Sequence, residues 1–136
     1  MAAYNKYTAA IEPLLEGINS GTDAWKIALA ATVNAADTTF TAGTTDLVTA
    51  GGYTAGGNAA TTTSATQTSG TYKLVLASPT AWTATGSGFT FRYAILWDST
   101  TNTPVGYWDY GSSQAVAAGE TVTVTLDATN GVFQGT

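Results

Sequence analysis

The segment from Phe89 to Asp98 constrains the fold more than any other part of the sequence. Its large side chains fall on every second residue, at Phe89, Phe91, Tyr93, Ile95 and Trp97. Successive side chains of a strand point to opposite faces, so an extended backbone would place all five on one face. The turn-forming run DSTTNTP and a second aromatic-rich run, VGYWDY, follow. This pattern predicts an antiparallel hairpin whose aromatic face is covered by the rest of the chain.

The composition favours a β-rich protein with a weakly charged exterior. Charged residues make up 10% of the 136 residues, against about 25% in typical domains. Threonine, alanine and glycine replace them, and the β-branched threonine suits a half-buried pleated surface. Because so few charges give little repulsion between copies, such a surface suits an assembly of closely packed subunits.

Further strands are predicted by alternation of apolar and polar residues in three segments, 25–30, 72–77 and 121–127. Residues 34–71 are rich in threonine, alanine, glycine and serine, and we expect a long excursion with short strands there. The dipeptide Asn130-Gly131 favours a tight turn, which would return the tail as the partner of 121–127.

A helix is predicted over residues 4–18, where apolar side chains recur at steps of three and four residues. Pro13 lies inside this segment, so the helix either kinks there or begins at Glu12–Pro13. The sequence therefore predicts a single domain over 1–136. It is mainly β, an antiparallel β-sandwich of jelly-roll type, with one short N-terminal helix at 4–18.

The residue types exclude most common catalytic chemistry. The chain has no histidine and no cysteine, so it lacks the commonest general base, the commonest metal ligand and any thiolate nucleophile. Two carboxylate pairs, Glu12 with Glu16 and Asp98 with Asp109, are candidates for acid–base catalysis, but solvated acids at such positions are far more frequent. No metal-binding or phosphate-binding motif is present. We expect no enzyme activity, and no catalytic, cofactor or metal site.

The charge pattern argues against binding to nucleic acid or membranes. The four basic residues are spread along the chain, at Lys6, Lys26, Lys73 and Arg92, and form no basic patch. No apolar run approaches the length that spans a membrane, and the N-terminus lacks the pattern of a signal peptide. We therefore expect synthesis in a cytoplasm.

The tryptophans suggest both core and partner contacts. Trp25 and Trp97 lie on apolar faces of predicted strands and are expected in the core. Trp82 is isolated among polar residues and is the best candidate for an exposed anchor. If Trp82, or Trp108 with Tyr110, were exposed and coplanar, the protein would have the stacking platform of a carbohydrate-binding module.

The chain resembles a family of small structural proteins of tailed-phage virions. The segments that carry the resemblance cover most of the chain: the opening YNKY, WKIALA, GYTAGGN at 52–58, SGTYKLVLASPTAWTATGSG at 69–88, FRYAILWD, WDYGSS at 108–113 and GETVTVTLDATNGVFQ. The resemblance implies a virion component, a capsid decoration (cement) protein that binds the major capsid protein and stabilises the head. It implies no catalytic residues.

On this reading the protein is made in the host cytoplasm and lies on the capsid surface as a homotrimer around the symmetry axes. We expect contacts with its partners from five aromatic residues, Tyr4, Tyr7, Tyr53, Trp82 and Trp108. The alternatives are a carbohydrate-binding β-sandwich module and a structural protein of the phage tail or neck.

Overall fold

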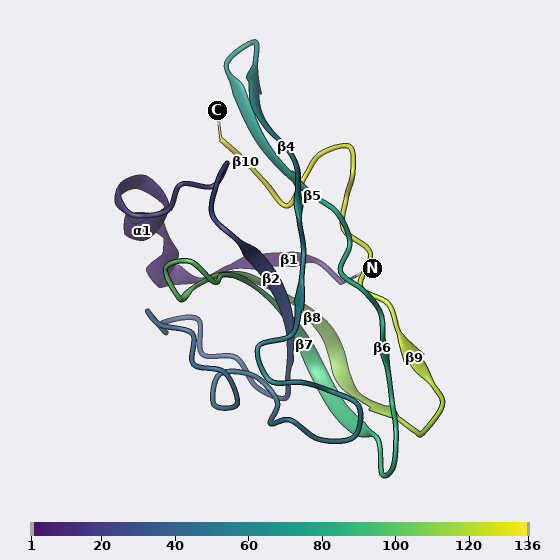
Figure 1. The fold of residues 1–136 in the computed structure, drawn as a ribbon. Helices are drawn as coiled ribbons and strands as arrows, with labels where there is room; N and C mark the ends of the chain where they lie inside the picture. Colours follow the sequence, from purple (N-terminus) through teal and green to yellow (C-terminus); the bar gives the residue numbers. More distant parts are fainter. Residues whose placement is uncertain (1, 136) are drawn as a thin grey trace.

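The fold is mainly β, with all of its strand pairs antiparallel, as predicted (Figure 1). The structure is a computed structural model that describes residues 2–135. Its strands are β1 Tyr4–Lys6, β2 Trp25–Ala30, β3 Asn58–Ala59, β4 Thr62–Thr68, β5 Thr71–Leu76, β6 Trp82–Thr83, β7 Phe89–Asp98, β8 Thr103–Val116, β9 Thr121–Val122 and β10 Phe133–Gly135. A 3-10 turn at Thr8–Ala10 leads into the helix α1, Ile11–Glu16.

The strands form three sheets. The largest has five strands in the order β1-β8-β7-β2-β3, and a three-stranded sheet has the order β10-β5-β4. β6 and β9 form a separate two-stranded ladder. Apolar side chains of all three sheets meet in one buried cluster, which includes Ile27, Leu74, Trp82, Leu96 and Trp108. The sheets therefore share a core.

The predicted hairpin is present as β7 and β8, but its aromatic side chains do not share one face. The register between the two strands shifts between Phe91 and Tyr93. Phe91 belongs to the shared core, whereas Ile95 and Trp97 lie in a second cluster. An extra residue in a ladder reverses which face the following side chains occupy. The prediction of a single aromatic face is therefore wrong, and β7 is buried on both faces from Ala94 to Asp98.

The second cluster lies on the other face of the central strands. Ala28 and Ala30 of β2 contribute to it, beside Tyr7 and Phe40. The Phe40 ring stacks on Trp97 at 3.9 Å between centroids. The small alanine side chains leave room for these rings, so the sheet is covered on both sides at its centre.

The prediction of a helix over 4–18 is wrong at its start. Tyr4–Lys6 forms β1, and Tyr4 lies opposite Trp108 of β8 with the ring centroids 5.2 Å apart. Pairing with β8 satisfies the backbone of this segment, and its aromatic side chains enter the core, so tertiary contacts override the helical spacing. Pro13 then lies in the first turn of α1, where its missing N–H breaks no helical hydrogen bond.

Residues 34–71 contain short strands, as expected, in β3 and β4, and the part before β3 is held by a buried carboxylate. Asp46 accepts hydrogen bonds from the backbone N–H groups of Gly43 and Gly56, both at 2.6 Å, and from the Tyr53 hydroxyl. That hydroxyl in turn accepts a bond from the N–H of Leu29 at 3.0 Å. Burial, and next the bond to Asp46, raise the pKa of Tyr53, which keeps its hydroxyl protonated as a donor. Asp46 thus fastens residues 43–56 to β2.

The C-terminal tail does not pair with residues 121–127, contrary to the prediction. β10 pairs with β5, with Phe133 opposite Leu74. Residues 121–127 keep the predicted alternation, since Val124 and Leu126 are buried, but only Thr121–Val122 enters a ladder, with β6. Gly131, with φ of +79°, forms a turn after which the backbone N–H of Val132 donates to the carbonyl oxygen of Leu74 at 2.8 Å.

Candidate partner-binding surface

The helix α1 presents apolar side chains to solvent. None of its six residues is buried. Ile11 is 46% exposed and Leu15 is 82% exposed, and they lie four residues apart on one side of the helix. The helix ends at Gly17, whose N–H bonds to the Pro13 carbonyl at 2.8 Å. Leu14 packs against the core clusters, whereas the exposed Ile11 and Leu15 are well placed to contact a partner.

An apolar groove of about 380 Å³ lies between this helix and the three-stranded sheet. Its helical wall consists of Ile11, Leu14 and Leu15, and its opposite wall includes Tyr72 of β5 and Phe133 of β10. Ser20, Gln134 and Gly135 complete it. We call the surface made by Ile11, Leu14, Leu15, Tyr72 and Phe133 the α1 groove. Most of its lining is therefore hydrocarbon.

The walls of the α1 groove are fixed by contacts to the core. The Ser20 hydroxyl bonds to the Tyr72 hydroxyl, and the Trp25 indole N–H donates to the Ser20 carbonyl at 3.0 Å. The Phe133 ring meets Trp25 edge to face at 6.1 Å. Because these groups are held by the sheet, a partner would bind a preformed surface at a smaller entropic cost.

The charge around the α1 groove is acidic. Glu12 and Glu16 are exposed on α1 beside Ile11 and Leu15. Neither residue takes part in an ion pair among residues 2–135. A complementary partner would insert an apolar side chain and place basic groups at the rim.

The five aromatic residues predicted to contact partners serve the core instead. Tyr7, Tyr53, Trp82 and Trp108 are buried within the chain, and Tyr4 is partly buried against Trp108. The expectation that Trp82 is an exposed anchor is wrong, because only 3% of it is exposed. β6 pairs with β9, and the Trp82 ring turns inward toward Tyr53 at 6.3 Å while Thr83 faces out. In this conformation none of the four buried rings is accessible to a partner.

The aromatic platform required by a carbohydrate-binding module is not formed by these residues. Trp82 and Trp108 are both buried, and Tyr110 is half-buried with its ring edge to face against Phe91 at 5.3 Å. Stacking on a sugar ring requires an open aromatic face. No observation on these rings therefore favours glycan binding.

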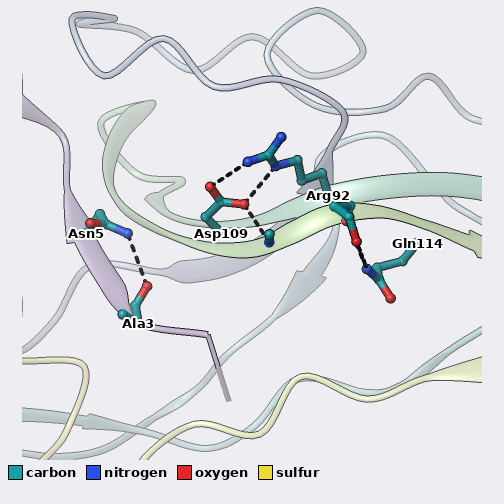
Figure 2. Close-up of polar contacts among 7 residues, drawn as sticks. Ala3, Asn5, Arg92, Asp109 and Gln114 are labelled. Atoms are coloured by element: carbon teal, nitrogen blue, oxygen red, sulfur yellow. Dashed lines mark hydrogen bonds and ion pairs between the residues drawn. The ribbon is translucent and has the colours of Figure 1, made fainter.

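The carboxylates considered as acid–base pairs have separate roles. Asp109 forms a two-point ion pair with Arg92, at 2.8 and 3.0 Å, and also accepts the N–H of Gly111 (Figure 2). Arg92 holds the pKa of Asp109 below its ordinary value. Asp98 points into the chain, where its Oδ1 accepts the N–H groups of Thr100 and Thr101. Asp98 and Asp109 thus share no site.

Asp98 instead forms a carboxyl pair with Asp23, which sequence reasoning missed. Asp98 is 0% exposed, and its buried Oδ2 has no hydrogen-bond partner among the described residues. The carboxyl group of Asp23 is the neighbouring acid that acts on its pKa. Asp23 is drawn there because its Oδ2 accepts the N–H of Asn19 at 2.8 Å, and the neighbouring Ala24 N–H bonds to Thr100. Burial, and then the bond to Asp23, raise the pKa of Asp98. The raised pKa favours the protonated form of this buried acid.

The substitution Asp98→Asn is expected to flatten the pH dependence of stability. The pKa of Asp98 is higher in the folded than in the unfolded state, where it is about 3.9. The protonated acid therefore adds its full contribution to the free energy of unfolding below about pH 3.9, and this contribution is lost as the pH rises through the folded-state pKa. Asparagine keeps the Oδ1 acceptor and donates an N–H to Asp23 at every pH. The variant should therefore gain about 1–2 kcal/mol over the wild type near pH 7 and lose that advantage in acid.

Urea unfolding of both proteins between about pH 4 and pH 8 measures this difference. Asp109→Asn is the control, because the pKa of Asp109 is lowered and its removal should have the opposite sign. Parallel stability curves for the wild type and Asp98→Asn would contradict the raised pKa of Asp98.

No cluster of three or more potential metal ligands occurs among the residues that the structure describes. No helix in that part of the chain is long and apolar enough to cross a membrane.

No protein-family model, curated protein or solved structure matches this chain.

Proposed function

We propose that this chain is a structural protein of a phage virion, a capsid decoration protein that binds the major capsid protein on the outside of the head and stabilises it. The single observation that carries the binding role is the α1 groove, where α1 adds no buried side chain to the core and Leu15 is 82% exposed. The resemblance of most of the sequence to phage virion proteins supplies the partner.

The surface chemistry suits a protein that functions by packing against other subunits. The exposed residues of β4 and of residues 121–125 are mostly threonine, and the chain carries only nine acidic and four basic side chains. Removing water from uncharged hydroxyl groups during assembly costs less free energy than removing it from charged groups. We also propose that the sheets, which share one core cluster, form a β-sandwich of jelly-roll type.

The proposal is tested by mixing the purified protein with capsids that lack decoration and sedimenting the mixture. The expected result is co-sedimentation at a fixed ratio to the major capsid protein. Capsids bound to the protein should also withstand a higher temperature before releasing their DNA. A protein that stays in the supernatant would overturn the decoration role, and binding to isolated tails or necks would assign it there.

Leu15→Glu is expected to weaken capsid binding by about tenfold or more, because truncating an apolar anchor at the centre of an interface typically costs more than 1 kcal/mol. The fold should be unaffected, since the Leu15 side chain lies outside the core. Co-sedimentation over a range of protein concentrations measures the change.

Val48→Glu is the matched control, because Val48 is 65% exposed, lies on the excursion of residues 43–56 and does not line the α1 groove. It introduces the same charge on an exposed apolar residue. If the two variants bind capsids equally well, the α1 groove is not the capsid-binding surface.

A further inference from the structure

The strand β4 has an open edge. In the three-stranded sheet the order is β10-β5-β4, so β4 pairs with β5 on one side only. Its seven residues read TTSATQT. The β4–β5 hairpin also projects beyond the rest of the molecule, with its turn at the far tip (Figure 1). The free side of β4 is therefore accessible along the outer part of the hairpin.

The hairpin geometry identifies which backbone groups are unpaired. Ser69 and Gly70, with φ of 51° and 82°, form a two-residue turn between the opposed residues Thr68 and Thr71. The two residues that close such a turn exchange backbone N–H to carbonyl hydrogen bonds with each other. Along the hairpin, every second opposed pair is hydrogen-bonded in the same way. The backbone groups of Ser64 and Thr66 accordingly point to β5. Those of Ala65 and Gln67 point to the open side, where no other segment of residues 2–135 pairs with them.

This edge lacks the usual protection against pairing. Natural edge strands are blocked by charged side chains, by proline, by bulges or by being very short. β4 contains no charged residue and no proline, and its register irregularity lies at its first residues, between Thr62 and Ser64. The other strands at sheet edges are two or three residues long, namely β1, β3, β6, β9 and β10. β4 is thus the longest strand that lies at the edge of a sheet in the described structure.

The strand is complementary to itself. If a two-fold axis passes through Ala65, then Ala65 faces its own copy, and Ser64 faces Thr66 of the other chain. Each outward N–H then meets an outward carbonyl, and no like charges oppose each other across the axis. The Ser64 and Thr66 hydroxyls lie on one face, 3.3 Å apart, while the loop at Gly21 lies near Ala65 on the other face. The second copy of β4 would therefore approach in the plane of the sheet, between these two faces.

We propose that β4 pairs antiparallel with β4 of a second copy of this chain, joining the two three-stranded sheets into one continuous sheet. This mode of recognition is strand addition at a sheet edge, with the partner supplied by the protein itself. An isologous pair closes at two copies, so the product is a dimer rather than the homotrimer expected at the outset. The inference does not depend on binding to a capsid.

The test uses two charged variants of the full chain, Ser64→Lys/Thr66→Lys and Ser64→Glu/Thr66→Glu. In a β4 pair, position 64 of one chain opposes position 66 of the other, so either variant alone places like charges opposite one another twice. Light scattering should give a dimer for the wild type and a monomer for each variant. An equimolar mixture of the two variants should restore the dimer mass.

Thr123→Lys/Thr125→Lys is the matched control, because these two exposed threonines have the same spacing in another extended segment. It should remain dimeric. Tryptophan fluorescence should show that every variant keeps the wild-type core. A monomeric wild type, variants that dimerise alone, or a trimer that survives these substitutions would each overturn the proposal, and so would a mixture of the two variants that stays monomeric.

Discussion

Asp46→Ala is expected to lower the free energy of unfolding by about 3–4 kcal/mol, because it leaves several buried donors without an acceptor. The carboxylate accepts two backbone N–H groups at 2.6 Å and the hydroxyl of the buried Tyr53. These donors cannot reach another acceptor without moving residues 43–56. The loop should therefore detach from β2, and Tyr53 should lose its fixed position.

Chemical denaturation measures the loss, and near-ultraviolet circular dichroism reports the environment of Tyr53 and Trp97. Asp46→Asn should be intermediate, since its amide retains one oxygen acceptor but turns an N–H toward a donor. Glu120→Ala, which removes the same charge from an exposed turn, is the control and should change stability by less than about 0.5 kcal/mol. An Asp46→Ala protein as stable as this control would show that the loop is held by other contacts.

Gly57→Ala is expected to destabilise the protein by about 3 kcal/mol or more, through a clash as well as backbone strain. Gly57 has φ of +73°, and a Cβ there would lie 1.9 Å from the carbonyl oxygen of Ile27 and 2.7 Å from the Cα of Ala28. Both contacts are with the backbone of the central strand β2, which cannot shift without disturbing its ladder with β7. The excursion should therefore be forced away from the sheet.

Gly86→Ala separates the two causes. Gly86 also has positive φ, +57°, but a Cβ there would meet nothing within 4 Å. Its substitution should cost only the strain of a left-handed backbone, about 1–2 kcal/mol. If the two variants unfold at the same denaturant concentration, the close approach of Gly57 to β2 does not limit stability.

The strands with strong alternation could be predicted from the sequence. β2 at WKIALA, β5 and β7 were each indicated by side chains of period two, and the hairpin loop before β8 by its run of turn-forming residues. The burial of alternate residues in 121–127 was also foreseen. The alternation within one segment shows which face of a strand is apolar, so these strands can be predicted without knowing what pairs with them.

The features that depend on distant contacts could not be predicted. The register shift beside Phe91 divides the aromatic side chains of β7 between two clusters, although their spacing is regular. Trp82 is surrounded by polar residues in the sequence, yet β9 pairs with its strand and turns the ring inward. Both outcomes depend on which segment pairs with which, and residue spacing does not specify that.

The candidate site was predicted only in part. The apolar residues of α1 were evident, but Tyr4 and Tyr7 were assigned to the same helix, and in the structure they belong to β1 and the core. The opposite wall of the α1 groove requires Phe133, whose position follows from the pairing of the tail with β5. The β4 edge arises in the segment with the weakest hydrophobic pattern, where no hairpin was predicted.

The pairing of β1 with β8 determines when this protein can fold. Tyr4 lies opposite Trp108, so during synthesis β1 waits for a strand that is made much later. Contacts that close such long loops form late and slow the folding of β proteins. The β4–β5 hairpin needs only its two-residue turn and can form early, before β10 is available to cover the other edge of β5. A nascent chain would therefore expose both edges of that hairpin, and unpaired strand edges are prone to association before the fold is complete.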